Sequence, residues 1–154
     1  LLKYPQAWIA LGFGTGLSPK APGTIGSLAA VALWWLLFAD FSLPVQAVII
    51  TLGFGLGVWV SHWMIARTGI ADPGFIVWAE FIGQWIALLL LPKALLWYAT
   101  AFALFRLFDI VKHGPVGWAD KRFKGGFGVM ADDVIAGLLA LVSTHLLIAL
   151  LARF

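Results

Sequence analysis

Residues 134–152, VIAGLLALVSTHLLIALLA, form a stretch without a single charged side chain. A second stretch, LPVQAVIITLGFGLGVWVSHWMIA at residues 43–66, is also uncharged. A helix needs about 20 apolar residues, within a tolerated range of about 17–25, to cross the hydrocarbon core of a bilayer. Both stretches therefore predict membrane-spanning helices, and we expect the rest of the fold to be arranged around them.

The composition of the whole chain agrees with a membrane protein. Of its 154 residues, 62% are apolar and only 11% are charged, and the mean hydropathy is +0.99. A soluble domain averages about 45–50% apolar and about 25% charged residues. A soluble monomer is therefore excluded, and so is a disordered chain, which requires low hydrophobicity and high net charge.

Apolar runs suggest how many times the chain crosses the membrane. Three runs are long enough to span and two are short, so five crossings is an upper count. We predict an all-α fold, a small polytopic membrane helix bundle with about four to five membrane helices, in a single domain over residues 1–154. The runs cover residues 25–39, 43–66, 76–91, 94–111 and 134–152.

The charged residues predict an orientation. With five crossings, the long polar loops lie on one face and the short loops on the other. The short-loop face carries only Lys93 and Arg153, and an excess of Lys and Arg marks the cytoplasmic side. We therefore expect the polar motifs on the cytoplasmic face. The basic residues of that face are Lys20, Arg67, Lys112, Lys121, Arg122 and Lys124.

Two further counts limit the chemistry. The chain has no Cys, which excludes disulfides, thiolate metal sites and a cysteine nucleophile. Its net charge of +3 suits an anionic membrane surface and is too small, on so apolar a chain, to indicate a nucleic-acid partner.

The first polar motif is the glycine-rich segment GFGTGLSPKAPGTIGS at residues 12–27. Glycines let backbone N–H groups face an anion, a following helix adds its dipole, and Lys20 could meet a phosphate. The alternative is a flexible loop in which Thr24 or Ser27 acts as an ordinary helix cap. Spacing alone leaves both interpretations open.

The second motif places an acid inside an apolar run. In DPGFIVWAE at residues 72–80, Glu80 begins a helical face that it shares with Gln84. An ionisable group in a membrane span is costly and indicates a partner or a function. The alternative to a functional acid is a Glu80 that pairs with Arg67 or Lys112 and serves packing only.

The third motif combines a helical ladder with an acidic pair. Arg106, Asp109 and Lys112 recur every three residues, so they share a helical face. Asp132 and Asp133 are expected to open the last helix, where acids also simply complement the helix dipole. Together with Glu80, these carboxylates form an oxygen-only ligand set that favours Mg²⁺ over Zn²⁺ and suits a phosphate held on a metal.

Four segments together resemble the phosphatidylglycerophosphatase A family. They are GLSPKAPGTIGS at 16–27, IVWxEFIG at 76–83, FRxFDxxK at 105–112 and GGxGVMxDDVxAG at 125–137. The resemblance implies a Mg²⁺-dependent bacterial inner-membrane enzyme that removes the terminal phosphate of phosphatidylglycerophosphate to give phosphatidylglycerol. The attacking group, water or a covalent nucleophile, stays open.

Carried over by position, the resemblance assigns the site residues. Glu80 and Asp109 are expected to be both catalytic and metal-binding. Arg106 and Lys112 are the expected basic catalytic residues. The remaining metal ligands would be Asp72, Asp132 and Asp133, and the residues that bind the substrate phosphate would be Ser18, Lys20, Thr24 and Ser27.

The chain departs from the family pattern beside Glu80. Similar sequences read Trp-Asp-Glu where this chain reads Trp78-Ala79-Glu80. Loss of a carboxylate there would weaken the metal site or remove a base, so we expect activity to be impaired. The alternative function is a small membrane transporter or channel in which Glu80 and Asp109 line an ion path; against it, the polar motifs crowd one face.

Overall fold

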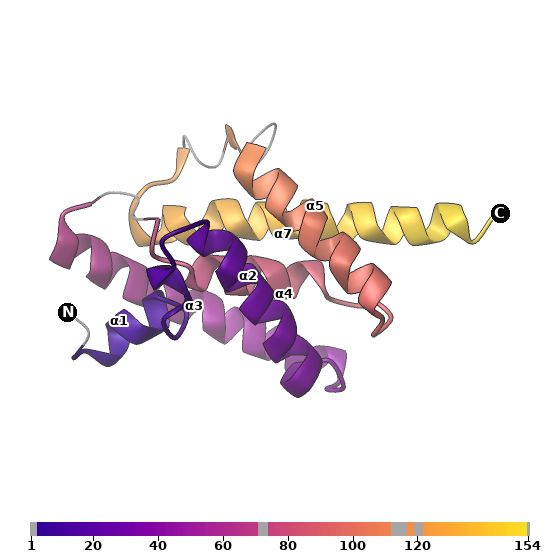
Figure 1. The fold of residues 1–154 in the computed structure, drawn as a ribbon, viewed down its shortest axis with the longest axis horizontal. Coiled ribbons are helices and arrows are strands. Elements are labelled where there is room, and N and C mark those ends of the chain that lie inside the picture. The colour runs from indigo at the N-terminus through magenta and orange to yellow at the C-terminus, as the bar shows by residue number, and fades with distance from the viewer. Residues whose placement is uncertain (1–2, 71–73, 112–116, 119–121, 154) are drawn as a thin grey trace.

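The computed structural model describes residues 3–70, 74–111, 117–118 and 122–153, and over these ranges the chain contains helices and no strand. The all-α prediction is therefore confirmed for the described part (Figure 1). The elements are α1 (Pro5–Ala10), the 3₁₀ turn η1 (Thr15–Leu17), α2 (Pro22–Leu33), its π-helical extension η2 (Trp34–Phe38), α3 (Leu43–Thr68), α4 (Trp78–Ala87), α5 (Leu95–Val111) and α7 (Gly125–Leu151).

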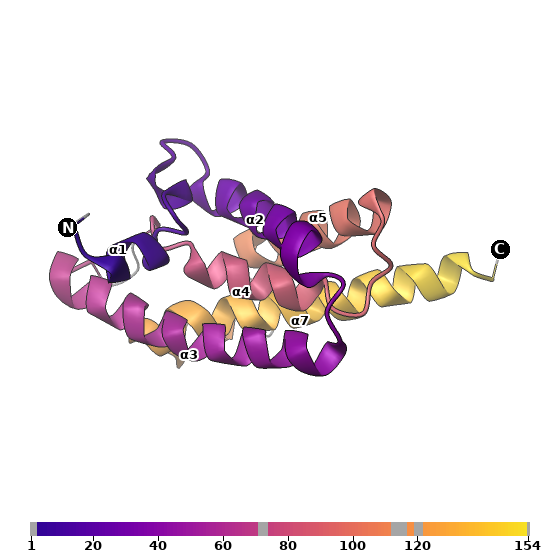
Figure 2. The same cartoon turned by 90° about the horizontal axis from the view of Figure 1, so that it is seen from below.

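Helix α4 is the centre of the fold. Nine of its ten residues are buried, and it packs against α2, α3, α5 and α7 (Figures 1 and 2). Apart from Glu80 and Gln84, which share one face, its side chains are apolar, and such a helix is expected to lie in a protein core. Two indole N–H groups fix it to its neighbours: Trp78 donates to the carbonyl of Gly53, and Trp85 donates to that of Ala30, both at 2.9 Å.

Two glycines bring α4 and α7 into backbone contact. A Cβ atom on Gly137 of α7 would overlap the carbonyl oxygen of Gly83. A Cβ atom on Gly83 would in turn lie 2.6 Å from the carbonyl oxygen of Asp133. Small residues allow helices to approach this closely. The crossing of the two helices is therefore set by the absence of side chains at these positions.

Helices α3 and α7, with 26 and 27 residues, are long and apolar enough to cross a membrane. Only 28% and 22% of their most apolar windows are buried, which is unlike the core helix of a soluble protein. Their outer faces carry exposed leucines such as Leu52 and Leu146. The C-terminal part of α7 extends beyond the other helices (Figures 1 and 2). A shorter apolar helix runs from Pro22 to Phe38.

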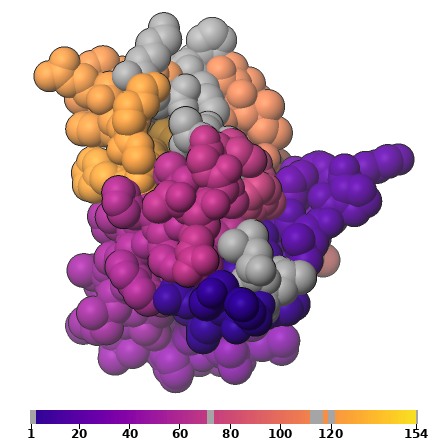
Figure 3. All heavy atoms as spheres, turned by 90° about the vertical axis from the view of Figure 1, so that its left-hand side faces the viewer, coloured from indigo at the N-terminus to yellow at the C-terminus, as the bar shows by residue number. Residues whose placement is uncertain are grey.

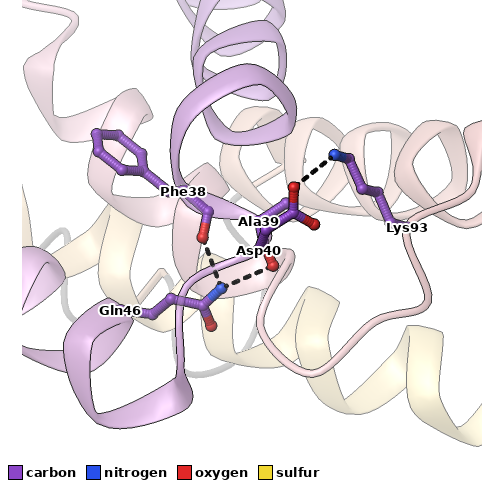
Figure 4. Close-up of polar contacts among 5 residues, drawn as sticks. All are labelled: Phe38, Ala39, Asp40, Gln46 and Lys93. Atoms are coloured by element: carbon purple, nitrogen blue, oxygen red, sulfur yellow. Dashed lines mark hydrogen bonds and ion pairs between the residues drawn. The ribbon is translucent and has the colours of Figure 1, made fainter.

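The turns at one end of the bundle are joined by polar contacts (Figure 4). The Gln46 side-chain amide donates to the carbonyls of Phe38 and Ala39, at 2.9 and 3.3 Å. Lys93, before α5, reaches Asp40, before α3, with 3.2 Å between Nζ and Oδ2. These contacts hold the α2–α3 and α4–α5 connections together.

The start of α7 corrects one expectation. Asp132 and Asp133 do not open the last helix, because α7 begins at Gly125 and they lie about two turns inside it. The interpretation that they complement a helix dipole is therefore wrong. Among the glycines before them, Gly126 packs closely on α3: a Cβ atom there would overlap the carbonyl oxygen of Val58.

The start of α2 corrects another. Neither Thr24 nor Ser27 caps this helix: its N-cap is Ala21, which makes no side-chain cap. The Ser27 hydroxyl is buried and donates to the carbonyl of Gly23 in its own helix, at 2.8 Å. Figure 3 shows the molecule end-on, and in this view the loop before α2 projects to the right.

Candidate metal and phosphate site

Three carboxylates from three helices meet beside α4. Glu80 of α4, Asp109 of α5 and Asp133 of α7 each offer an oxygen atom, and these atoms lie within 4.8 Å of one another. Asp109 and Asp133 are only 6% and 4% exposed. The spacing of acids along the sequence predicted this group, and the fold confirms that the three lie together.

The glycine contact between α4 and α7 explains where two of these acids lie. Glu80 comes three residues before Gly83, and Asp133 comes four residues before Gly137. Residues three or four apart lie on one face of a helix. Because Gly83 and Gly137 touch, the turns that precede them bring the two carboxylates to the same place.

One arginine serves two of the acids. Nη1 of Arg106 lies 2.6 Å from Oδ2 of Asp109 and 4.0 Å from Oε1 of Glu80. The first contact confirms the Arg106–Asp109 part of the predicted ladder on α5, while Lys112 lies outside the described residues. The alternative pairing of Glu80 with Arg67 is not observed, since the Arg67 guanidinium stacks on the ring of Tyr4 at 4.6 Å.

The acids and the arginine surround a pocket of about 250 Å³. Its polar wall includes Asp132 as well as the residues named above, and its apolar wall includes Ala79. The described lining residues are Gly74, Ile76, Ala79, Glu80, Arg106, Asp109, Ile110, Val129, Asp132 and Asp133.

The donor set fits a hard divalent cation. Oδ2 of Asp133 and Oε2 of Glu80 are buried and have no hydrogen-bond partner among the residues that the structure describes. A buried polar atom without a partner is costly, and a cation between the carboxylates would satisfy both. Three acids against one arginine leave the cluster with excess negative charge, which also favours a cation.

The remaining predicted residues lie elsewhere in the fold or outside the residues that the structure describes. Asp72 and Lys112 fall outside the described residues. Ser18 donates its hydroxyl to the Lys20 carbonyl, at 2.8 Å, in an exposed turn. The four residues predicted to bind the substrate phosphate are not among the described lining residues of the pocket, and their role stays a prediction. They are Ser18, Lys20, Thr24 and Ser27.

The apolar wall of the pocket was not predicted. Ile76 precedes α4, Ile110 lies on α5 and Val129 lies on α7, so three separate segments contribute one side chain each. Apolar residues are common throughout this chain, so nothing in the sequence distinguished these three. Only the crossing of the helices shows that they line the site.

The fold and the site together define a small helical protein with membrane-length apolar helices and a pocket lined by acids that could hold a metal ion. The family model described as Phosphatidylglycerophosphatase A matches residues 8–148. The chain therefore belongs to the phosphatidylglycerophosphatase A family, as its motifs predicted.

Curated relatives support this membership. The chain is 43% identical over 143 residues to "Phosphatidylglycerophosphatase A" of Escherichia coli (strain K12), covering 90% of this chain and 82% of the relative. It is 41% identical over 139 residues to the protein of the same name from Haemophilus influenzae, covering 90% and 85%. It is also 42% identical over 144 residues to a "Putative phosphatidylinositol-3-phosphatase" of Bacteroides thetaiotaomicron, covering 87% of each. No solved structure matches the chain.

Proposed function

We propose that this protein is a lipid phosphatase that hydrolyses phosphatidylglycerophosphate to phosphatidylglycerol and phosphate. The observation that carries the proposal is that the matched family region, residues 8–148, includes one pocket in which Glu80, Asp109, Asp133 and Arg106 meet. A transporter or channel with Glu80 and Asp109 lining an ion path is not favoured, because the relatives are named as phosphatases.

The carboxylates would hold Mg²⁺. Glu80, Asp109 and Asp133 supply oxygen ligands from three helices, and Asp132 lies in the same pocket. The predicted Asp72 would add to this set. A bound Mg²⁺ polarises a phosphate and lowers the pKa of a nearby water. The burial of Asp109 and Asp133, with Glu80 partly buried, supports a cation here, because carboxylates in a protein interior need compensating charge.

Arg106 would bind the phosphate. Its Nε atom is buried without a hydrogen-bond partner among the described residues, while Nη1 holds Asp109. A guanidinium fixed by one carboxylate is oriented to donate to phosphate oxygens. Lys112, Lys20 and the hydroxyls of Ser18, Thr24 and Ser27 complete the proposed phosphate-binding set.

The proposed reaction is a phosphomonoester hydrolysis. A water oxygen bonds to phosphorus, the bond from phosphorus to the glycerol oxygen breaks, and the proton that the water loses is balanced by one taken up by the leaving glycerol oxygen. Charge develops on that leaving oxygen in the transition state, where nearby positive groups stabilise it.

Activity would be reduced by the residue beside Glu80. Ala79 is buried, only 2% exposed, and lines the pocket. We propose that the family's aspartate at this position adds a ligand or base, so Ala79 leaves the site with one carboxylate fewer. The Ala79→Asp variant tests this directly.

The experiment is phosphate release in detergent, with Mg²⁺ and with EDTA. The substrates are phosphatidylglycerophosphate and, because of the Bacteroides relative's name, phosphatidylinositol 3-phosphate. We expect Mg²⁺-dependent release from the first, higher for Ala79→Asp than for the unchanged chain, and none for Glu80→Gln. Asp40→Asn, at an exposed position away from the pocket, is the matched control. Folded protein without release from either substrate, in the unchanged chain and in Ala79→Asp, would overturn the proposal.

We further propose that the protein is a multi-pass protein of a bacterial inner membrane, with the pocket on the cytoplasmic side. The two long apolar helices and the excess of basic residues near the motifs support this. Because the chain has no Cys, single cysteines report topology cleanly. In spheroplasts, an impermeant maleimide should label Ser42→Cys and not Lys20→Cys; the reverse pattern would contradict the orientation.

A further inference from the structure

The first turn of α2 lies directly on the acidic site. Gly23 is the second residue of this helix. A Cβ atom on Gly23 would lie 3.0 Å from Nη2 of Arg106 and 3.0 Å from Oε1 of Glu80. It would also lie 3.3 Å from Nη1 of Arg106. The missing side chain therefore leaves just enough room for two charged groups of the pocket.

Gly23 differs from the glycines that pack against backbone, and its added Cβ atom would meet charged side chains. At Gly16, Gly126 and Gly137 a Cβ atom would overlap backbone carbonyl oxygens, so a substitution there must move the backbone. At Gly23 the neighbouring atoms are the ends of two long side chains. An added methyl group would therefore displace the Glu80 carboxylate and the Arg106 guanidinium while leaving the helices in place.

Contacts with α4 and the residue before it keep helix α2 in place beside the site. Ala30, two turns after Gly23, accepts the hydrogen bond from the buried Trp85 indole. Gly26 packs on Val77, where an added Cβ atom would lie 3.0 Å from the Val77 Cβ. Before the helix, Ala21 has φ +46°, a left-handed conformation that is strained for a non-glycine residue preceding a proline. The backbone around Gly23 is thus fixed on both sides.

We propose that Gly23 is a positioning residue that sets where Glu80 and Arg106 lie in the site. The inference rests on the proposed function, in which Glu80 holds Mg²⁺ and Arg106 binds the substrate phosphate. An added methyl group requires both side chains to shift by a few tenths of an ångström. From the usual cost of such a displacement, Gly23→Ala weakens Mg²⁺ binding roughly three- to tenfold and raises KM by a similar factor.

The test compares Gly23→Ala with Gly55→Ala. Gly55 is exposed on α3 and an added Cβ atom there meets nothing within 4 Å, so it controls for a glycine-to-alanine change in a helix. Mg²⁺ binding is measured by calorimetry, the Tm is measured in EDTA, and KM and kcat are measured in the Ala79→Asp background. We expect both variants to keep their Tm and only Gly23→Ala to lose Mg²⁺ affinity.

A second background shows whether the effect passes through Arg106. Arg106→Lys removes the Nη atoms that face Gly23, so Gly23→Ala should raise KM less in that background. If Gly23→Ala raises KM by the same factor in both backgrounds, the effect does not pass through Arg106.

Two other outcomes distinguish a failure of this inference from a failure of the proposed function. Unchanged Mg²⁺ affinity in Gly23→Ala, or a loss that only follows a lower Tm, would overturn the role of Gly23 and leave the proposed function standing. A wild-type chain that binds no Mg²⁺ would overturn the metal site itself.

Discussion

Nη1 of Arg106 lies 2.6 Å from Oδ2 of Asp109, one turn further along α5, and the same nitrogen lies 4.0 Å from Oε1 of Glu80. One positive charge is thus placed between two carboxylates that come from different helices. Asp133 completes the group with no second arginine or lysine among the described residues that line the pocket. This imbalance makes the pocket suitable for a cation, and it makes Arg106 the natural place for an incoming phosphate.

The first prediction concerns Arg106. Arg106→Ala leaves two mostly buried carboxylates without their counter-charge, which costs about 3 kcal/mol in the free energy of unfolding when a buried pair is broken. It also removes the proposed phosphate donor, so kcat/KM should fall by about 10²–10³-fold. Thermal unfolding and phosphate release measure the two effects.

Lys93 provides the control for Arg106. Its ion pair with Asp40 lies in exposed turns, where such pairs contribute at most about 1 kcal/mol. Lys93→Ala should therefore leave activity unchanged and the Tm nearly so. If Arg106→Ala behaves like Lys93→Ala in the assay, Arg106 does not bind the phosphate.

The second prediction concerns Asp133. Asp133→Asn removes one of three neighbouring negative charges while keeping the size of the side chain. In EDTA the Tm should rise by a few degrees, which corresponds to about 1 kcal/mol, because like charges no longer repel. With Mg²⁺ the wild type should have the higher Tm, since the wild-type chain gains stability from binding and the variant gains little.

Thermal unfolding with and without Mg²⁺ measures this reversal. Asp40→Asn is the control, because the Asp40 side chain is 82% exposed and lies away from the pocket. An equal Mg²⁺-induced increase in the Tm for Asp133→Asn and the wild type would show that Asp133 is not a ligand.

Much of the fold could be predicted from apolar runs. The run at residues 43–66 corresponds to α3, and the run at 94–111 corresponds to α5 almost residue for residue. The start of α7 could not be predicted in this way, because glycine-rich segments favour turns. The missing side chain of Gly126 lets the first turn of α7 pack on α3 at Val58, which is a tertiary effect.

The acidic members of the site could also be predicted, since acids are rare in this chain. Their partner was harder to identify. Arg67 was a reasonable partner for Glu80, but its guanidinium stacks on the rings of Tyr4 and Trp63. Which basic side chain faces Glu80 depends on how α4 and α5 cross. The role of Gly23 depends on the same geometry, because a glycine in a glycine-rich segment gives no sign of what it touches.

The third prediction concerns the contact between α4 and α7. In Gly137→Ala the added methyl group meets the backbone of Gly83, which cannot move away as a flexible side chain can. Overpacking of this kind costs about 1–3 kcal/mol, so the Tm should fall. Because the same contact places Asp133 near Glu80, Mg²⁺ affinity should fall as well.

Gly55→Ala is again the matched control, and there alanine should be neutral or stabilising, since alanine favours a helix by up to about 1 kcal/mol over glycine. Equal Tm values for the two variants would mean that the helices are not packed as closely as the structure shows.

The last prediction concerns Ala79, the buried lining residue at which we propose that an aspartate would complete the site. In Ala79→Asp a further carboxylate joins the four acids that line the pocket, so in EDTA the added repulsion and burial should lower the Tm. With Mg²⁺ the variant should recover, bind the ion more tightly and release phosphate faster. Ala79→Asn has the same shape without the charge and should show neither gain. A variant that is destabilised in EDTA and gains nothing from Mg²⁺ would show that position 79 does not contribute to the metal site, and that the reduced activity expected for this chain has no basis there.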